Sequence, residues 1–237
     1  MSVRTSSGDL GQLQEIFAKE FSARAADAVS RRGKFVLALT GGSVAPAFFP
    51  TLASLAVDWS RSEIFWGDER AVPPDHPDSN YRLARQLLLS PAGIPASCIH
   101  RLKAELPDLD DAARLASDEL LAIAGDPPEL DVAILGVGAD GHVASIFDTA
   151  GIESCAQGVI PVYNSPKPPP RRLTLTFPVL ARARLAIIIA LGAEKAPAMR
   201  AALDGSGTTP VAELLRRARS ALVLLDHEAA ILLAGSW

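Results

Sequence analysis

Cysteine is scarce in this 237-residue chain, which has two, Cys98 and Cys155, and no C-x-x-C pair. A disulfide-stapled fold needs more cysteines than this. We therefore expect both to be reduced, buried thiols, as is usual for proteins of the cytosol.

Long apolar runs and concentrated positive charge are also missing. No apolar run approaches the roughly 20 residues of a transmembrane helix, and the N-terminal "MSVRTSSGDLGQLQEIF" has no apolar signal core. Lys and Arg total 23 against 27 Asp and Glu, a net charge of −4, with no dense basic stripe. We expect a cytoplasmic protein that binds neither membrane nor nucleic acid. An anionic substrate would need only a few well-placed cations.

Apolar segments alternate with helical patterns along the chain, and 49% of its residues are hydrophobic, enough for a packed core. Apolar residues recur with helical spacing from Leu13 to Val29, and this helix is expected to stop at Gly33. Later helices are expected over 44–56, 81–89, 108–124, 194–203, 209–219 and at the C-terminus. Strands are expected over 34–40, 62–67, 131–136, 159–164, 172–176, 185–192 and 221–226. The pattern predicts a single α/β domain over residues 1–237, with a mostly parallel sheet covered on both faces.

Four polar, glycine-containing turns directly follow predicted strands. They are "TGGS" (40–43), "GDER" (67–70), "GVGADGH" (136–142) and "GAEK" (192–195). In open α/β sheets, ligands bind outside the carboxyl ends of the strands. We therefore expect the four turns to share one site.

The third turn has the G-x-G-x-x-G spacing of a dinucleotide-binding loop, but its surroundings do not fit one. Only about two helical turns could follow Gly141 before Gly151. The next predicted strand ends in Asn164 rather than in a ribose-binding acid, and Asp140 would repel a pyrophosphate.

A catalytic role is the alternative for this turn. His142 can titrate near neutral pH, and Asp140 can fix its tautomer and raise its basicity. Gly136, Gly138 and Gly141 would allow positive φ and close backbone approach to a ligand. From the turn alone, a structural role is equally open, in which His142 caps a following helix and Asp140 bonds loop amides.

The other turns also permit two interpretations each. Residues Gly41, Gly42 and Ser43 offer consecutive amides and a hydroxyl for an anion, or form an ordinary strand–helix turn. The charged side chains at strand ends either bind a ligand or are merely solvated: Asp68, Glu69, Arg70, Lys195, Arg171 and Arg172.

Taken together, the motifs resemble the 6-phosphogluconolactonases. The matching segments are "LTGGSVAP", "FWGDERAVPPDHPDSNYRLARQLLL", "DVAILGVGADGHVASIF", "RRLTLTFPVL" and "ALGAEKAPAMRAAL", in the family's order. The resemblance implies a three-layer, Rossmann-like α/β/α fold shared with glucosamine-6-phosphate deaminases and ribose-5-phosphate isomerases. It also implies hydrolysis of 6-phosphogluconolactone in the pentose phosphate pathway, without metal or nucleotide cofactor.

The same resemblance implies roles for the site residues. His142 would be the general base and Asp140 its orienting partner, while Asp68 would contact sugar hydroxyls. Arg70 and loop amides are candidates for stabilising the oxyanion. The substrate phosphate would bind at Gly41, Gly42, Ser43, Arg172 and Lys195. The residues leave open whether Arg171 or Arg172 faces the phosphate, and whether the protein is a monomer or a homodimer.

Two other functions on this fold fit the sequence less well than the lactonase. The related deaminases carry Asp-Glu-Tyr where this chain has Asp68-Glu69-Arg70, and a Glu shortly after Asp-Gly-His, where the nearest acid here is Asp148. A sugar-phosphate-sensing regulator would need a DNA-binding segment before the domain. Residues 1–33 instead read as one helix. Both comparisons favour the lactonase.

Overall fold

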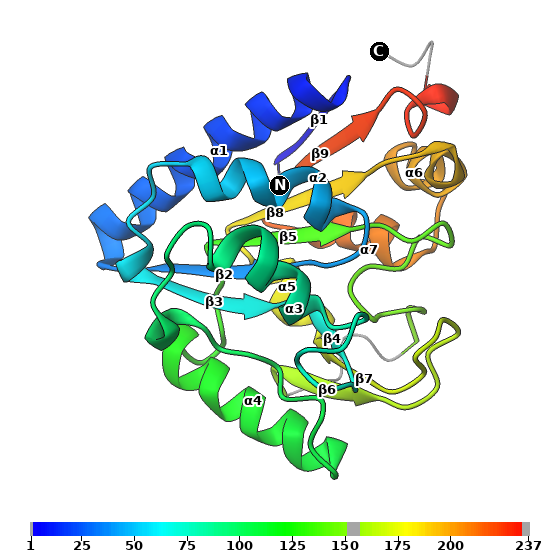
Figure 1. Cartoon of the computed structure of the whole chain (residues 1–237). Coiled ribbons are helices and arrows are strands. Elements are labelled where there is room, and N and C mark those ends of the chain that lie inside the picture. The colour runs from blue at the N-terminus through cyan, green and yellow to red at the C-terminus, as the bar shows by residue number, and fades with distance from the viewer. Residues whose placement is uncertain (1, 151–156, 234–237) are drawn as a thin grey trace.

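A six-stranded parallel sheet forms the centre of the molecule. The computed structural model describes residues 2–150 and 157–233. The strand order is β1-β9-β8-β5-β2-β3, and every neighbouring pair is parallel (Figure 1). The strands are β1 (Ser2–Gly8), β2 (Phe35–Leu39), β3 (Ser62–Trp66), β5 (Val132–Gly136), β8 (Leu185–Ala190) and β9 (Ser220–Asp226).

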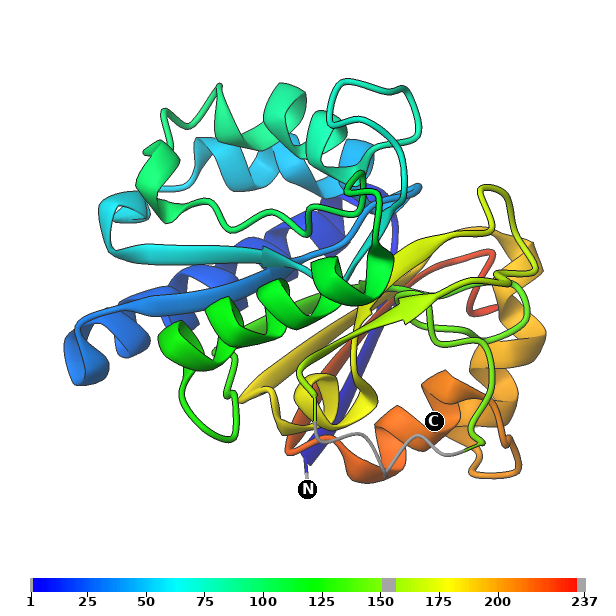
Figure 2. The same ribbon diagram turned by 90° about the horizontal axis from the view of Figure 1, so that it is seen from below.

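Helices cover both faces of this sheet. Figures 1 and 2 show α1 and α2 on one face and α4, α5 and α7 on the other, which confirms the predicted three layers. The helices are α1 (Leu10–Arg32), α2 (Val44–Ser54), α3 (Asn80–Ala84), α4 (Leu109–Ala124), α5 (Phe177–Arg182), α6 (Ala196–Leu203) and α7 (Pro210–Arg217). Within the described part of the chain, none of them is long and apolar enough to cross a membrane.

Shorter helical segments complete the elements. A π-helical segment, Arg85–Leu89, continues α3. Single 3₁₀ turns lie at Trp59–Arg61, Ala96–Cys98, Ala193–Lys195 and Ile231–Leu233. The last of these is the described part of the predicted C-terminal helix.

A second, antiparallel sheet lies beside the carboxyl ends of the main strands (Figure 1). Its order is β4-β7-β6, with β4 (Asp68–Arg70), β6 (Val159–Val162) and β7 (Arg172–Leu175). The sequence predicts strands at β6 and β7, but not that they leave the parallel sheet to pair with the "GDER" segment. This small sheet brings Asp68 and Arg70 next to the Pro-rich turn 165–170.

The N-terminal segment differs from its expectation. Residues 1–33 were expected to be one helix, but β1 precedes α1 and pairs with β9. The segment "SVRTSSG" is polar and mostly exposed, so it carries no apolar pattern that marks a strand. The segment becomes a strand because the open edge of β9 supplies its hydrogen-bond partners. The short helix α5 was also not expected.

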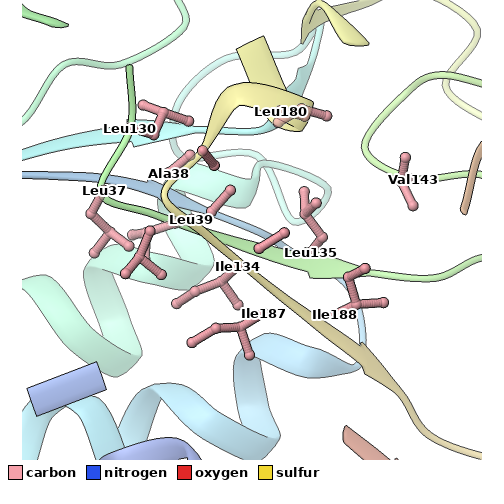
Figure 3. Packing of buried hydrophobic residues seen from close by; sticks show 14 of the residues in the cluster. Leu37, Ala38, Leu39, Leu130, Ile134, Leu135, Val143, Leu180, Ile187 and Ile188 are labelled. Carbon is pink, nitrogen blue, oxygen red and sulfur yellow. The ribbon is translucent and has the colours of Figure 1, made fainter. Parts of the chain in front are cut away.

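The apolar core lies between the sheet and its helices (Figure 3). Helix α1 buries Leu13, Phe17, Phe21, Ala25 and Ala28, at the spacing that places them on one stripe. All six residues of β8 are buried, as a central parallel strand requires. Cys98 is free and buried, as expected, and Cys155 lies outside the described residues.

Candidate active site

A cavity of about 270 Å³ opens at the carboxyl ends of β2, β3, β5 and β8. All four predicted turns contribute to its lining, together with the Pro-rich turn. Of the predicted site residues, these line it: Gly41, Gly42, Ser43, Asp68, Arg70, His142, Arg172 and Lys195. Asp140 stands behind His142. The structure therefore brings the four turns together at the carboxyl ends of the strands.

The turn after β2 has the geometry of an anion-binding loop. Gly42 has a φ of 60°, a backbone conformation that residues with side chains rarely adopt. Ser43 is the N-cap of α2, and its hydroxyl does not cap the helix. The positive end of the α2 dipole and a spare hydroxyl thus face the cavity.

The turn after β5 holds His142 against Asp140. The imidazole Nδ1 lies 2.5 Å from Asp140 Oδ1. The backbone between them is a tight loop, closed by hydrogen bonds from Gly138 N to His142 O and from Gly141 N to Gly138 O, both 2.9 Å. The described residues directly after His142, 143–150, form no helix. This removes both the helix-capping role and the helix that a pyrophosphate would require.

The three glycines of this turn do different things. Of the three, Gly141 alone uses the conformational freedom of glycine, with a positive φ of 81°; Gly136 and Gly138 do not. Gly138 instead provides space, because a Cβ there would lie 2.0 Å from His142 Nδ1. At Gly141, a Cβ would lie 2.7 Å from Thr209, where α7 begins. Val211 N donates to Gly141 O at 2.9 Å and anchors the loop on that helix.

The charges of this pair suit a general base. Burial is the largest influence on the pKa of His142 and lowers it below 6.5, outweighing the opposite effect of Asp140. Burial alone would raise the pKa of Asp140, but the hydrogen bond and charge of His142 outweigh it and lower that pKa. Near neutral pH, Nδ1–H therefore donates to an ionised carboxylate. The Nε2 lone pair remains available to accept a proton.

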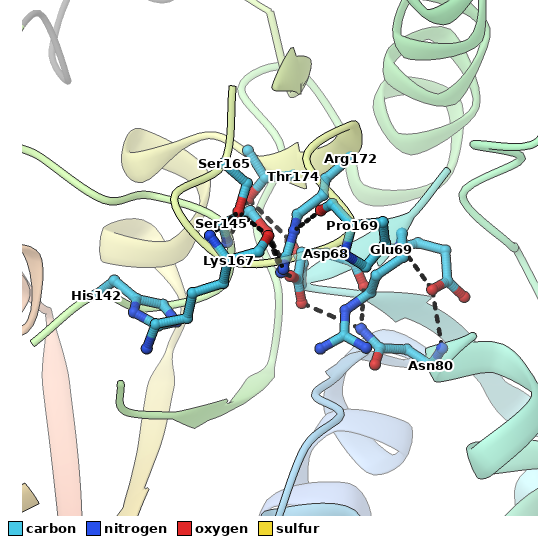
Figure 4. Close-up of polar contacts among 12 residues, drawn as sticks. Asp68, Glu69, Asn80, His142, Ser145, Ser165, Lys167, Pro169, Arg172 and Thr174 are labelled. Atoms are coloured by element: carbon cyan, nitrogen blue, oxygen red, sulfur yellow. Dashed lines mark hydrogen bonds and ion pairs between the residues drawn. The ribbon is translucent and has the colours of Figure 1, made fainter. Parts of the chain in front are cut away.

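Asp68 is held by a buried polar network (Figure 4). Its Oδ2 accepts from Ser145 Oγ at 2.6 Å, and its Oδ1 accepts from Asn80 Nδ2 at 3.3 Å. Arg172 Nη1 contacts the same Ser145 hydroxyl at 3.3 Å and Asp68 Oδ2 at 3.7 Å. Ser145 N in turn donates to Thr174 Oγ1. The His142 loop, β4 and β7 are thereby joined through one carboxylate.

Glu69 organises the loop that follows β4 rather than facing the cavity. Its buried carboxylate accepts from the backbone N–H of Arg70, Asn80 and Tyr81, at 2.7, 2.8 and 2.8 Å. Ser79 Oγ donates to it at 3.1 Å. Burial nevertheless raises its pKa. The loop brings Arg70 into the cavity wall, where its Nε is buried and has no hydrogen-bond partner among the described residues.

The cationic side chains are not equally available to a ligand. Each guanidinium nitrogen of Arg172 already contacts a protein oxygen. A phosphate contact by Arg172 stays a prediction and would require it to exchange one of these. Arg171 is exposed, outside the cavity lining, with its guanidinium 5.9 Å from the Tyr163 ring centre. Lys195 lies in the lining, with its Nζ 3.3 Å from Glu194.

Three polar residues of the site, two in the cavity lining and one beside it, were not predicted from the sequence as site residues or neighbours. Asn80 and Lys167 line the cavity, and Ser145 bridges Asp68 to Arg172. "DSNY" lies within one of the segments that resemble the family, but its place in the site, like that of the Pro-rich turn 165–170, depends on the antiparallel sheet. With Lys167 included, the lining has four cations and one carboxylate, in a chain whose net charge is −4. The cavity therefore favours an anion.

The chain is similar to known proteins over most of its length. A model of the family described as glucosamine-6-phosphate isomerases/6-phosphogluconolactonase matches residues 8–224. A 6-phosphogluconolactonase of Mycobacterium tuberculosis is 40% identical over 216 residues, covering 86% of this chain and 87% of that one. One of Streptomyces coelicolor is 37% identical over 235 residues, covering 92% and 89%.

Solved structures share the fold over nearly the whole chain. A 6-phosphogluconolactonase of Thermotoga maritima has a TM-score of 0.82 at 28% identity, covering 95% of this chain and 99% of its own. One of Trypanosoma brucei has 0.83 at 27%, covering 98% of both. A monomeric glucosamine-6-phosphate deaminase has 0.82 at 20% identity, which shows the fold alone. From the family match and these relatives, the chain belongs to the glucosamine-6-phosphate isomerase/6-phosphogluconolactonase family.

Proposed function

We propose that this protein hydrolyses 6-phosphoglucono-1,5-lactone to 6-phosphogluconate, a step of the oxidative pentose phosphate pathway. The observation that carries the proposal is the His142–Asp140 pair at the wall of a cation-rich cavity. A lactone bound there presents its carbonyl carbon to a neutral imidazole and its phosphate to positive charge. The relatives named 6-phosphogluconolactonase support the same substrate.

The reaction needs a base and donors for an oxyanion, but no covalent nucleophile. Nε2 of His142 takes a proton from water as the water oxygen attacks C1, and the carbonyl oxygen becomes an oxyanion. When the oxyanion collapses, the bond from C1 to the ring oxygen breaks, and that oxygen receives the proton from His142. A positioned base of this kind contributes about 10²- to 10⁴-fold. Arg70, whose side chain lines the cavity, is a candidate donor to the oxyanion.

Binding energy from the phosphate orients the reacting carbon. We assign the phosphate to Gly42 and Ser43 at the α2 N-terminus, with Gly41 behind them and Lys195 as the cation. Arg172, which lines the cavity and holds the Pro-rich turn, is a further candidate for the phosphate. Asp68, fixed by Ser145 and Asn80, is assigned to the sugar hydroxyls.

The direct test is His142→Ala, assayed with freshly made lactone after subtraction of spontaneous hydrolysis. We expect kcat to fall by about 10²- to 10⁴-fold. His227→Ala is the control, because His227 is exposed and outside the cavity lining. A His142→Ala protein with wild-type kcat would refute the mechanism.

A deaminase activity has less support. The family of deaminases uses a Glu shortly after Asp-Gly-His, and the nearest acid here, Asp148, is exposed and absent from the cavity lining. Its Oδ1 accepts from Ala150 N at 2.9 Å. Ammonia release from glucosamine 6-phosphate, at a rate comparable to lactone hydrolysis, would favour that activity instead.

The proposed enzyme works in the cytoplasm, as a monomer or a homodimer, without metal or nucleotide. Among the residues that the structure describes, no three His, Cys, Asp or Glu side chains are grouped so that they could hold a metal ion. Dialysis against a chelator is therefore expected to leave kcat unchanged. A loss restored by a divalent cation would contradict this expectation.

A further inference from the structure

Lys167 shares the carboxylate that orients the proposed base. Its Nζ lies 3.5 Å from Asp140 Oδ1, the same oxygen that lies 2.5 Å from His142 Nδ1. Both side chains line the cavity, and Figure 4 shows Lys167 extending toward the imidazole. The positive charge of Lys167 therefore lies near His142, the side chain that would act as the base at the lactone carbonyl.

The backbone of Lys167 is held firmly although its side chain is 43% exposed. Arg172, itself only 4% exposed, donates to the carbonyls of Lys167, Pro168 and Pro169 at 2.9, 3.2 and 3.0 Å. Ser165 Oγ donates to Lys167 O and accepts from Lys167 N, at 2.8 and 3.1 Å. The turn thus presents a flexible ammonium from a fixed base.

These contacts give different roles to Lys167 of the Pro-rich turn and to Arg172 of β7. Arg172 uses its guanidinium nitrogens to hold the turn and Asp68. The ion pair of Lys167 with Asp140 is long, at 3.5 Å, and such exposed pairs are weak. The Lys167 ammonium can therefore leave Asp140 for a stronger anion at little cost.

The proposed reaction creates such an anion beside His142. The lactone carbonyl is neutral, the tetrahedral intermediate carries an oxyanion on C1, and the product carries a carboxylate there. We propose that Lys167 is a further catalytic residue, whose ammonium moves from Asp140 to contact this C1 oxygen in the intermediate and in the product. The inference rests on the proposed lactonase function. It names a group that stabilises the transition state rather than the bound substrate.

The test compares Lys167→Met and Lys167→Arg with Lys103→Met, a change at an exposed lysine outside the cavity lining. For Lys167→Met we expect kcat to fall about 10- to 100-fold, near the lower end for an oxyanion donor. The KM for the lactone should change less than about threefold, because the phosphate sites are intact. Lys167→Arg should restore most of the rate, and Lys103→Met should match the wild type.

Two further readouts separate catalysis from mere support of the fold. Competitive inhibition by 6-phosphogluconate should weaken in Lys167→Met, because its carboxylate loses a contact. The acid limb of kcat/KM should move to higher pH, since Lys167 opposes the protonation of His142, against the favouring charges of Asp140 and Asp68. A structural loss would move neither and would lower the thermal stability instead.

Several outcomes would overturn the inference. One is a kcat within twofold of wild type in Lys167→Met, with unchanged product inhibition. Another is a raised KM at constant kcat, which would make Lys167 a ground-state phosphate ligand. A wild-type protein that does not hydrolyse the lactone, or His142→Ala with full kcat, would instead refute the proposed function or its base.

Discussion

Gly138 lacks a side chain, and its surroundings show what a methyl group would displace. A Cβ built on it lies 2.0 Å from His142 Nδ1, 2.1 Å from Cε1 and 2.4 Å from Asp140 Oδ1. Because unbonded carbon and nitrogen atoms approach to about 3.5 Å, the Gly138→Ala change must push the imidazole away by about 1.5 Å. A misplacement of about 1 Å costs about 10²-fold, and the whole base contributes up to about 10⁴-fold. We therefore expect kcat to fall by about 10²- to 10⁴-fold.

The fold should tolerate this change. Gly138 does not have a positive φ, so alanine suits its backbone, and Asp140 is partly exposed and free to swing outward. The assay is lactone hydrolysis with the spontaneous rate subtracted, together with thermal unfolding. Gly67→Ala is the matched control, because a Cβ there meets nothing closer than Leu39 O at 3.6 Å.

A double variant sharpens the result. If the added methyl acts by displacing the imidazole, His142→Ala should cost little more in a Gly138→Ala background than Gly138→Ala alone. A folded Gly138→Ala enzyme with kcat within threefold of wild type would refute the space argument.

Three further expectations follow from contacts described above. Glu69→Ala leaves three backbone N–H groups without their acceptor, at a cost of about 1–3 kcal/mol each. Urea denaturation should therefore show that the free energy of unfolding falls by about 3 kcal/mol or more, and a fall below about 1 kcal/mol would contradict this. Lys195→Ala should raise KM with little change in kcat, and an unchanged KM would remove Lys195 from the phosphate site. Because burial lowers the pKa of His142, activity should persist as pH falls until the base is protonated, with a midpoint below 6.5 in kcat/KM; a midpoint above 6.5 would contradict the direction.

The sequence predicts most of the main sheet because most of its strands are short apolar runs. The run from Leu185 to Ala190 is apolar throughout, and its short length and three consecutive isoleucines favour a strand buried on both faces. The exception is β1, whose serines and threonines resemble a loop. Its extended form depends on hydrogen bonds with β9, which are not a property of its own residues.

The candidate site divides in a similar way. The sequence predicts that residues directly after parallel strands, such as His142 and Asp68, lie close together, because the carboxyl ends of such strands share one edge of the sheet. Lys167 and Ser145 could not, because their positions depend on the antiparallel pairing of β4, β6 and β7. The network around Arg172 likewise becomes visible only when its burial and partners are known.

The pairing of β1 with β9 also bears on how the chain is made. Ser2 pairs with Ser220, so β1 leaves the ribosome long before β9 and has no partner until β9 has been made. At about 5–20 residues per second, that wait is about 10–40 s. During it, the polar "SVRTSSG" segment stays soluble where an apolar strand would invite association with other chains. The composition that hides β1 from pattern analysis thus protects the nascent chain until its sheet is complete.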